Sequence, residues 1–411
     1  MVRQRIPAGT STAPTGTGGG GVTLKAVEDA ARSVWAIAPS AESGLTAVAA
    51  NNSTDDTARL QAILNYVKAT YGGGDVHLPN KTMRLTSTLT IPSRVRVLGT
   101  QASILNFSSA PDGTVCVSVN DTDFTPFIGV EINGKGTGSG QTGLKVKGFG
   151  LRFVDVRVDG FKWGVDMFES DTYINSFDHC VFVSCQLILQ IDLGDAWSSH
   201  GRQAGNSGER TTFLDCTFAN SDDVYFSSGS GAGLHFVGCS FDFVGRLGSQ
   251  WDSHAFFDSC HFEFNGGTYD HAFRLRGYSR LTIGDSNFIC GGNLHHLVWT
   301  DEAPGTVGGG RAHVSGSHTY HPQTPAAQAA GALRADFSEW RFAVPTGATS
   351  VTVSSFLISS WSTTRVQPVA VGTTPEADVR ARVSAIDPFA GTATITLSAP
   401  APAGTVLEVS F

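Results

Sequence analysis

The chain has 411 residues, of which 16% are charged and 48 are glycine, and its formal net charge is -8 at pH 7. A low charged fraction with much glycine, serine and threonine argues against a helical protein and favours many short strands joined by tight turns. The composition also excludes a basic nucleic-acid-binding surface, and no apolar run approaches the ~20 residues that span a bilayer.

The first 50 residues are predicted to form an N-terminal arm. Residues 1–23 are rich in glycine, threonine and proline and lack the apolar core of a signal peptide, so we expect synthesis in the cytosol without ordinary export. A short helix is expected from Leu24 to Val34, and a linker of small residues follows it.

Residues 51–100 carry the most informative local pattern. Capping side chains at 52–57 precede apolar residues at helical spacing, and the glycines at 72–74 end the predicted helix. Short strands are expected at 75–79, 83–90 and 94–99. The apolar positions of the helix are Leu60, Ile63, Leu64 and Val67.

This stretch, STDDTARLQAILNYVKATYGGGDVHLPNKTMRLTSTLTIPSRVRVLGT, resembles the N-terminal cap of pectate-lyase-like proteins, which is common in phage tail spikes and polysaccharide-degrading enzymes. The shared pattern is an acidic-threonine start, a short helix, a Gly-Gly turn, a strand ending in Leu-Pro and strands running into a glycine. The resemblance implies an all-β, right-handed parallel β-helix whose open hydrophobic end is covered by the helix. Structural roles are therefore expected for Asp55 and Asp56.

A hexapeptide recurs through the middle of the chain, with an aromatic or aliphatic residue at each end and a small residue in fourth place. Clear copies start at residues 177, 213, 236 and 257, a weaker one at 283, and further candidates at 153 and 314. A spacing of mostly roughly 20–30 residues suits one turn of a solenoid. We predict inward aromatic ladders and a tight corner that only a small fourth side chain fits.

The seven cysteines are odd in number and lack zinc-ligand spacing, so we predict buried free thiols and no disulfide scaffold. Four of them occupy the fourth place of the hexapeptide. No other set of residues has convincing metal-ligand spacing, and no phosphate- or dinucleotide-binding motif is present, so no metal site and no cofactor are expected.

The domain division follows from these patterns. We expect an arm over 1–50, the capped β-helix over 51–321, a linker over 322–336 and a small β-domain over 337–411. The last domain would close the solenoid, trimerise or bind sugar. Its strands are expected at 350–353, 364–371, 379–386, 392–397 and 406–411.

Aligning the turns on the hexapeptide predicts one polar column. It contains His254, His271 and His296 on successive turns, with Asp223, Asp270 and Asp252 beside them. Neighbouring turns lie ~4.8 Å apart, so these groups are expected to interact. The column is either a groove that binds or cleaves glycan, or a polar ladder whose aspartates serve turns. The pair Asp222-Asp223 is similar to the paired aspartates of polygalacturonase-like enzymes, but no Gly-His-Gly or Arg-x-Lys partner follows it.

The insertion from Leu193 to Arg210 is a second candidate site, because loops over a scaffold often carry function. The candidate catalytic residues are Asp222, Asp223, Asp252, Asp270 and Glu209. The candidate substrate-binding residues are His254, His271, His296, Trp197, Trp251, Arg274 and Arg276. The tryptophans would stack on sugar rings and the arginines would bind an acidic sugar. The alternatives are packing against neighbouring loops or chains for the tryptophans, and a solvated face for the arginines.

The resemblance implies a homotrimeric phage tail spike that is made in the host cytoplasm and binds bacterial surface polysaccharide. Its N-terminal arm would bind other tail or baseplate proteins, with no nucleic acid and no membrane insertion. Whether it depolymerises the glycan stays open, with a glycoside hydrolase favoured over a lyase. The alternatives are a structural or receptor-binding virion spike without enzymatic activity, and a stand-alone polysaccharide lyase or glycoside hydrolase.

Overall fold

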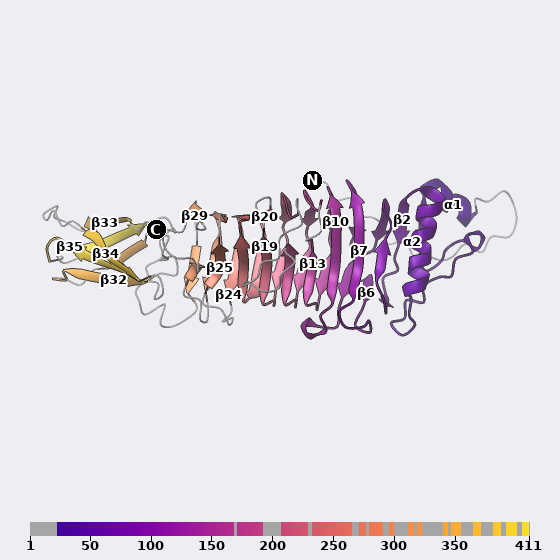
Figure 1. The fold of residues 1–411 in the computed structure, drawn as a ribbon, viewed down its shortest axis with the longest axis horizontal. Coiled ribbons are helices and arrows are strands. Elements are labelled where there is room, and N and C mark those ends of the chain that lie inside the picture. The colour runs from indigo at the N-terminus through magenta and orange to yellow at the C-terminus, as the bar shows by residue number, and fades with distance from the viewer. Residues whose placement is uncertain are drawn as a thin grey trace.

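The fold was analysed in a computed structural model (Figure 1). It describes residues 23–167, 171–191, 207–228, 232–264, 271–276, 279–290, 296–299, 311–315, 319–322, 340–343, 347–354, 365–370, 381–387, 392–400 and 405–410. Neither helix longer than one turn in these ranges has the length and apolar character needed to cross a membrane.

Three long parallel sheets, which we name A, B and C, form the body of the described chain. Sheet A has eleven strands, in the order β1 (Ser33–Trp35), β2 (Gly74–His77), β5 (Val95–Leu98), β8 (Phe127–Ile128), β11 (Arg152–Val154), β14 (Ser176–Asp178), β17 (Thr211–Leu214), β20 (Gly233–Val237), β23 (His254–Asp258), β26 (Arg280–Gly284) and β29 (Arg311–Ser315). Sheet B has ten, in the order β3 (Thr82–Arg84), β6 (Ile104–Asn106), β9 (Glu131–Asn133), β12 (Arg157–Asp159), β15 (Val181–Val183), β18 (Thr217–Ala219), β21 (Ser240–Val244), β24 (His261–Phe264), β27 (Asn287–Cys290) and β30 (Thr319–Pro322). Sheet C has nine, which are β4 (Leu89–Ile91), β7 (Val115–Thr122), β10 (Thr142–Phe149), β13 (Trp163–Asp166), β16 (Leu187–Ile191), β19 (Asp223–Ser228), β22 (Arg246–Trp251), β25 (His271–Arg276) and β28 (His296–Trp299).

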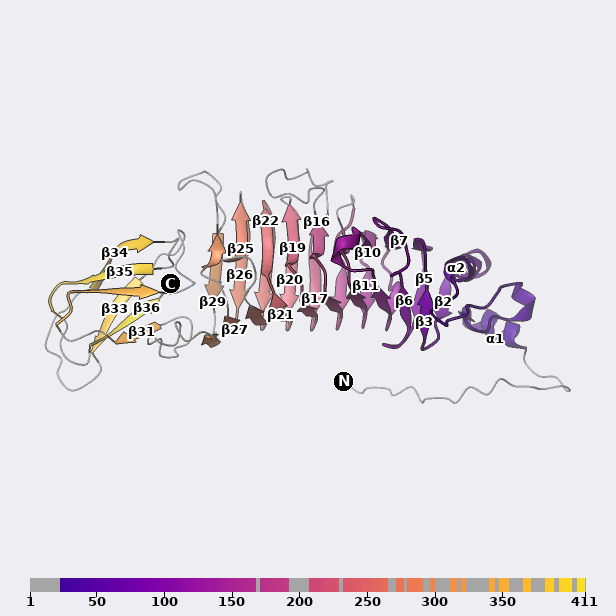
Figure 2. The same ribbon diagram turned by 90° about the horizontal axis from the view of Figure 1, so that it is seen from below.

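The chain visits the three sheets in turn, and this path makes the fold a parallel β-helix. Strands β17, β18 and β19 belong to sheets A, B and C, and the next three strands pair with them in parallel, one on each sheet. Figure 2 shows β16, β19, β22 and β25 lying side by side along the solenoid. The predicted fold is confirmed.

Two aromatic ladders fill the interior. The first residue of each hexapeptide points inward from sheet A, and the sixth points inward from sheet B. Stacked ring centroids lie 4.6 to 4.9 Å apart in the first ladder, which contains Phe153, Phe177, Phe213, Phe236 and Phe257. They lie 4.8 to 5.2 Å apart in the second, which contains Phe182, Phe218, Phe241, Phe262 and Phe288. Like rings stack because equivalent residues of successive turns are neighbours in the sheet.

The corner between sheets A and B explains the middle of the hexapeptide. Its third residue adopts the left-handed backbone conformation, with φ of 54° at His179, 50° at Asp215 and 64° at Gly238. The following cysteine is buried in the corner. Each thiol reaches the carbonyl of a phenylalanine on the previous turn, as Cys216 does at 3.2 Å from the oxygen of Phe177. Cys180, Cys239 and Cys260 make the same contact at 3.5 Å. A larger side chain would displace the ladder.

We expect the six described cysteines to be unreactive in the folded protein. All six are buried, and burial raises the pKa of the Cys116 and Cys185 thiols to about 12, so little thiolate forms at neutral pH. Titration with a disulfide reagent such as DTNB should label these thiols only after unfolding in urea. The side chain of Cys290 lies outside the described residues, so rapid labelling of two or more thiols in the native protein would contradict this expectation.

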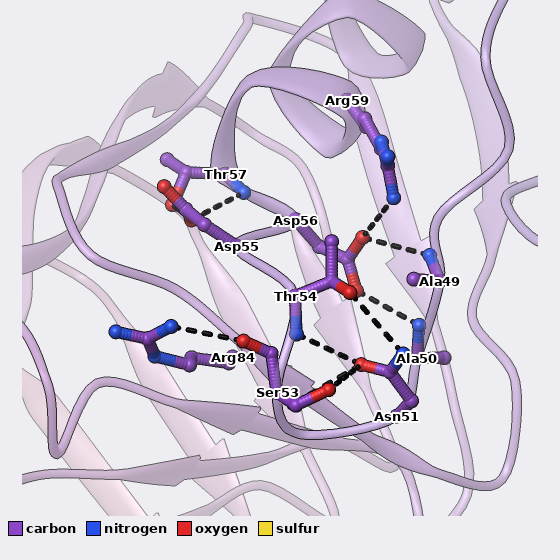
Figure 3. Close-up of polar contacts among 10 residues, drawn as sticks. All are labelled: Ala49, Ala50, Asn51, Ser53, Thr54, Asp55, Asp56, Thr57, Arg59 and Arg84. Atoms are coloured by element: carbon purple, nitrogen blue, oxygen red, sulfur yellow. Dashed lines mark hydrogen bonds and ion pairs between the residues drawn. The ribbon is translucent and has the colours of Figure 1, made fainter.

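Helix α2 (Thr57–Tyr71) closes the first turns and confirms the predicted helix. It buries Leu60, Ile63, Leu64 and Val67, and it ends at Tyr71, directly before Gly72 with its φ of 74°. The carboxylate of Asp56, directly before the helix, is fully buried and accepts hydrogen bonds from the backbone N–H groups of Ala49 at 2.7 Å and Ala50 at 2.8 Å (Figure 3). These contacts give Asp56 the structural role expected of it.

Two N-terminal boundaries differ from the prediction. Helix α1 (Leu24–Ala31) ends before Val34, because Arg32 takes a left-handed conformation and Ser33–Trp35 pairs with β2 as the first strand of sheet A. The β-helix therefore starts before residue 51. The single strand expected at 83–90 is two strands, β3 on sheet B and β4 on sheet C, because the chain turns between them.

Two three-stranded antiparallel sheets follow the solenoid in the described C-terminal residues. One has the order β31 (Trp340–Ala343), β36 (Thr405–Ser410), β33 (Arg365–Ala370), and the other β32 (Ser350–Ser354), β35 (Thr392–Leu397), β34 (Ala381–Asp387). All five expected strands are present within a few residues of their predicted bounds, and β31 is additional. Two short 3-10 helices, Ala41–Ser43 and Thr137–Ser139, lie in the N-terminal half.

Candidate functional site

A row of outward side chains runs across sheet C at the start of its strands. The parallel register pairs Trp163 with Leu187, Leu187 with Asp223, and Asp223 with Arg246, on β13, β16, β19 and β22. These residues line a cavity of about 160 Å³. The rest of its lining is Lys162, Gln186, Tyr225, Phe226 and Ser249.

An ion pair forms one wall of the cavity. Arg246 donates from Nε to Oδ1 of Asp223 at 2.6 Å and from Nη2 to Oδ2 at 3.0 Å, so both oxygens are engaged. The side chain of Arg246 is only 13% exposed, and that of Asp223 only 19%. Burial raises the pKa of the Asp223 carboxyl, although the Arg246 guanidinium acts in the opposite direction. A bidentate pair of this kind has a fixed geometry, and its outer edges can bind polar ligand groups.

An aromatic ring and a cation form another part of the lining. Nζ of Lys162 lies 4.3 Å from the ring centroid of Trp163, within the range of a cation–π contact. Both side chains are half-buried. The cavity thus combines an indole face, a carboxylate, two cationic groups and the amide of Gln186, which suits a ligand with both apolar faces and hydroxyl or carboxylate groups.

The predicted histidine column is wrong at His254. This residue begins β23 on sheet A, where it pairs with Arg280, and its side chain is exposed. His271 and His296 do pair with each other on sheet C, at the starts of β25 and β28, but their side chains lie outside the described residues. The sheet C strand of the turn that begins at Phe236 is β22, so Arg246 takes the place that the prediction gave to His254.

Asp252 and Asp222 both lie in turns. Asp252 follows β22 with a φ of 53°, away from Asp223 in the sheet register. Asp222 is exposed directly before β19, and its carbonyl accepts the N–H of Arg246 at 2.8 Å. Among the candidate catalytic residues whose side chains are described, Asp223 alone lines the cavity.

The remaining candidates are dispersed. Glu209 is half-buried in a turn, and its carbonyl accepts the N–H of Ile174. Trp251 ends β22 and pairs with Arg276, whose side chain lies outside the described residues. Arg274 on β25 is in register with Ser249. Asp270 and Trp197 lie outside the described part of the chain.

The sequence analysis missed Lys162, Trp163, Gln186 and Arg246. A signal for two of them exists, because Trp163, Leu187, Asp223 and Arg246 follow the hexapeptides that start at 153, 177, 213 and 236 at a constant offset. Placing the start of each sheet C strand ten residues after the start of its hexapeptide would have put these four residues in one row.

A second cavity of about 390 Å³ lies outside the corner between sheets A and B. Its described lining includes Glu131, Asp155, Arg157 and His179, but no tryptophan, tyrosine or phenylalanine. Nη2 of Arg157 lies 2.9 Å from Oδ2 of Asp159, and its Nε lies 4.0 Å from Oε1 of Glu131. The site on sheet C is the stronger candidate for sugar binding, because it adds an aromatic face to the polar groups.

No family model matches the chain. Among solved structures, it is similar to a mutant of the tailspike protein of E. coli bacteriophage HK620, with 10% identity, 94% of each chain covered and a TM-score of 0.41. PfbA, a surface adhesin of Streptococcus pneumoniae, has 11% identity over 71% of this chain and 79% of its own, with a TM-score of 0.45. A pectate lyase has 15% identity over 69% of this chain and 80% of its own, with a TM-score of 0.32. Identities this low say nothing about which residues bind a ligand.

Proposed function

We propose that this chain is a phage tail spike that binds bacterial surface polysaccharide on the outward face of sheet C. The observation that carries the proposal is the row of Trp163, Asp223 and Arg246 around one cavity. A parallel β-helix repeats outward positions every ~4.8 Å along its length, and such an extended surface suits a polymeric ligand.

The lining favours an acidic polysaccharide. Lys162 and Arg246 contribute two cationic groups, and Asp223 is the one carboxylate among the lining residues that the structure describes. The apolar face of a sugar would pack on the Trp163 indole, while its carboxylate and hydroxyl groups would bind the arginine and lysine.

We propose binding at this cavity rather than cleavage. Hydrolysis of a glycosidic bond requires two carboxyl groups on either side of the bond. Among the described residues of the lining, Asp223 is the one carboxylate, and its two oxygens already bind Arg246. A receptor-binding spike without enzymatic activity is therefore preferred over a glycoside hydrolase, a lyase or a stand-alone enzyme.

In this proposal the spike is a homotrimer whose N-terminal arm binds other tail or baseplate proteins. The support is the resemblance of residues 53–100 to the caps of tail spikes, in which three parallel chains usually pack side by side. Light scattering of the purified full chain tests this assembly: a mass three times that of the chain supports it, and a monomer contradicts it.

Replacing Trp163 by alanine is expected to weaken polysaccharide binding roughly tenfold or more, because tryptophans that a ligand covers commonly dominate the binding energy. The measurement is a biosensor titration against immobilised capsular polysaccharides and O-antigens, with acidic and neutral glycans compared. Trp35→Ala is the matched control, since Trp35 is 50% exposed and lies on sheet A. Equal affinities of the wild type and Trp163→Ala for every glycan that binds would refute the site.

A further inference from the structure

The outward face of sheet B carries a cluster of metal-ligating side chains that sugar binding on sheet C does not use. Asp242, His261 and Glu263 each offer one ligand atom, and these atoms all lie within 4.8 Å of one another. All three side chains are partly exposed, so an ion from solution can reach them. We propose that this cluster binds a divalent first-row transition metal ion such as Zn²⁺.

The backbone fixes where the three groups stand. His261 and Glu263 are two residues apart on β24 and point to the same face, whereas Phe262 between them is buried in the core. Asp242 on β21 is in register with Glu263. The cluster is thus a triangle across two turns of the solenoid, built on strands rather than on loops.

The distances between the ligand atoms need to shorten only a little for the cluster to hold a metal ion. Nε2 of His261 lies 4.0 Å from Oδ1 of Asp242. Bonds of about 2.0 to 2.1 Å in a tetrahedral site place ligand atoms roughly 3.3 Å apart. Rotation of partly exposed side chains can make up this difference, and the fourth position would stay open to water or to a ligand group.

Charge favours a cation at this place. The carboxylates of Asp242 and Glu263 are neighbours across the strands, and like charges in this position repel. No lysine or arginine among the described residues forms an ion pair with either of them. One imidazole with two carboxylates suits Zn²⁺ or a related ion better than Ca²⁺, which takes six to eight oxygen ligands.

Two neighbours hold the ligands in place. Oγ of Ser240 donates to Oδ1 of Asp242 at 2.7 Å. The side-chain amide of Asn287 lies 3.1 Å from Nδ1 of His261, and its Oδ1 has no hydrogen-bond partner among the described residues. Turning the amide over would let that oxygen accept the Nδ1–H, which leaves the Nε2 lone pair facing Asp242 for the metal.

Isothermal titration of the full chain with ZnCl₂ tests the proposal. The wild type should bind Zn²⁺ more tightly than Ca²⁺, and His261→Ala and Glu263→Gln should each weaken the site roughly tenfold or more. His179→Ala is the matched control, because Nε2 of His179 lies 3.7 Å from Oδ2 of Asp215 and no third metal-ligating group among the described residues joins them. Circular dichroism establishes that each variant folds.

Co²⁺ gives a second measurement that depends on ligand identity. The wild type with Co²⁺ should show a visible absorption band that both variants lose and the control keeps. A wild type that binds no Zn²⁺, variants that bind as tightly as the wild type, or tighter binding of Ca²⁺ than of Zn²⁺ would overturn the proposal. Glycan binding is not read in these assays, so failure of the metal site leaves the site on sheet C untouched.

Discussion

Replacing Phe257 by alanine is expected to lower the free energy of unfolding by about 3–5 kcal/mol, the usual range for a phenylalanine removed from a packed core. Phe257 is fully buried and stacks on Phe236 with ring centroids 4.6 Å apart. Its edge contacts with Phe241 and Phe262 join the two ladders, with centroids 5.6 Å apart in both pairs. The cavity left behind would interrupt both ladders. Urea unfolding followed by tryptophan fluorescence measures the loss.

Phe256→Ala provides a matched control on the same strand. Phe256 is adjacent to Phe257 but faces outward and is 36% exposed. Its ring centroid lies 5.8 Å from that of His235. A cross-strand surface pair contributes roughly 0.2–1 kcal/mol, so this change should have a small effect. Similar unfolding midpoints for the two variants would contradict the inward and outward assignment of β23.

Replacing Asp56 by alanine is expected to lower the free energy of unfolding by about 2–4 kcal/mol. The change leaves the buried N–H groups of Ala49 and Ala50 without an acceptor, and the carboxylate also loses its 3.2 Å contact with Nη1 of Arg59 (Figure 3). Hydrogen bonds to a charged group contribute about 1.5–3 kcal/mol each, and unpaired buried groups add to the loss. Thermal unfolding by circular dichroism checks this value.

Two further variants separate the buried carboxylate from charge in general. Asp56→Asn keeps the shape of the side chain but turns an N–H₂ group toward backbone donors, so it should also destabilise the cap. Asp112→Ala removes an exposed carboxylate whose partner is Lys135, and it should change stability by less than about 1 kcal/mol. Equal losses for Asp56→Ala and Asp112→Ala would show that the cap does not depend on this network.

The ladders could be predicted because they rest on a local, repeated pattern, and the cap because residues 53–100 resemble the caps of pectate-lyase-like proteins. Phe213 and Phe218 occupy fixed places in the hexapeptide, and the narrow interior stacks like residues on like. A small residue stands at Cys216 because the left-handed residue before it turns the chain sharply, which leaves little room in the corner. The constraints on the hexapeptide lie within six residues, so one sequence is enough to reveal them.

The site was harder to predict because loop lengths vary from one turn to the next. Sheet C starts at a constant offset for Trp163, Leu187, Asp223 and Arg246, but β25 begins later after its hexapeptide. Aligning the polar segment that follows each hexapeptide placed His254 on the same sheet as His271, whereas His254 begins a strand of sheet A. Which residues pair across a solenoid sheet depends on where each strand begins, and polar patterns alone do not reveal where the strands begin.

A crystal structure of the full chain with a bound oligosaccharide would show whether the outward face of sheet C is where this protein binds glycan. The oligosaccharide should be prepared from the polysaccharide that binds most tightly in the biosensor titration. We expect a sugar ring packed on the indole of Trp163, with polar groups bound to Arg246 on the outward face of sheet C. An oligosaccharide seated only on sheet A, on sheet B or on the C-terminal sheets would contradict it.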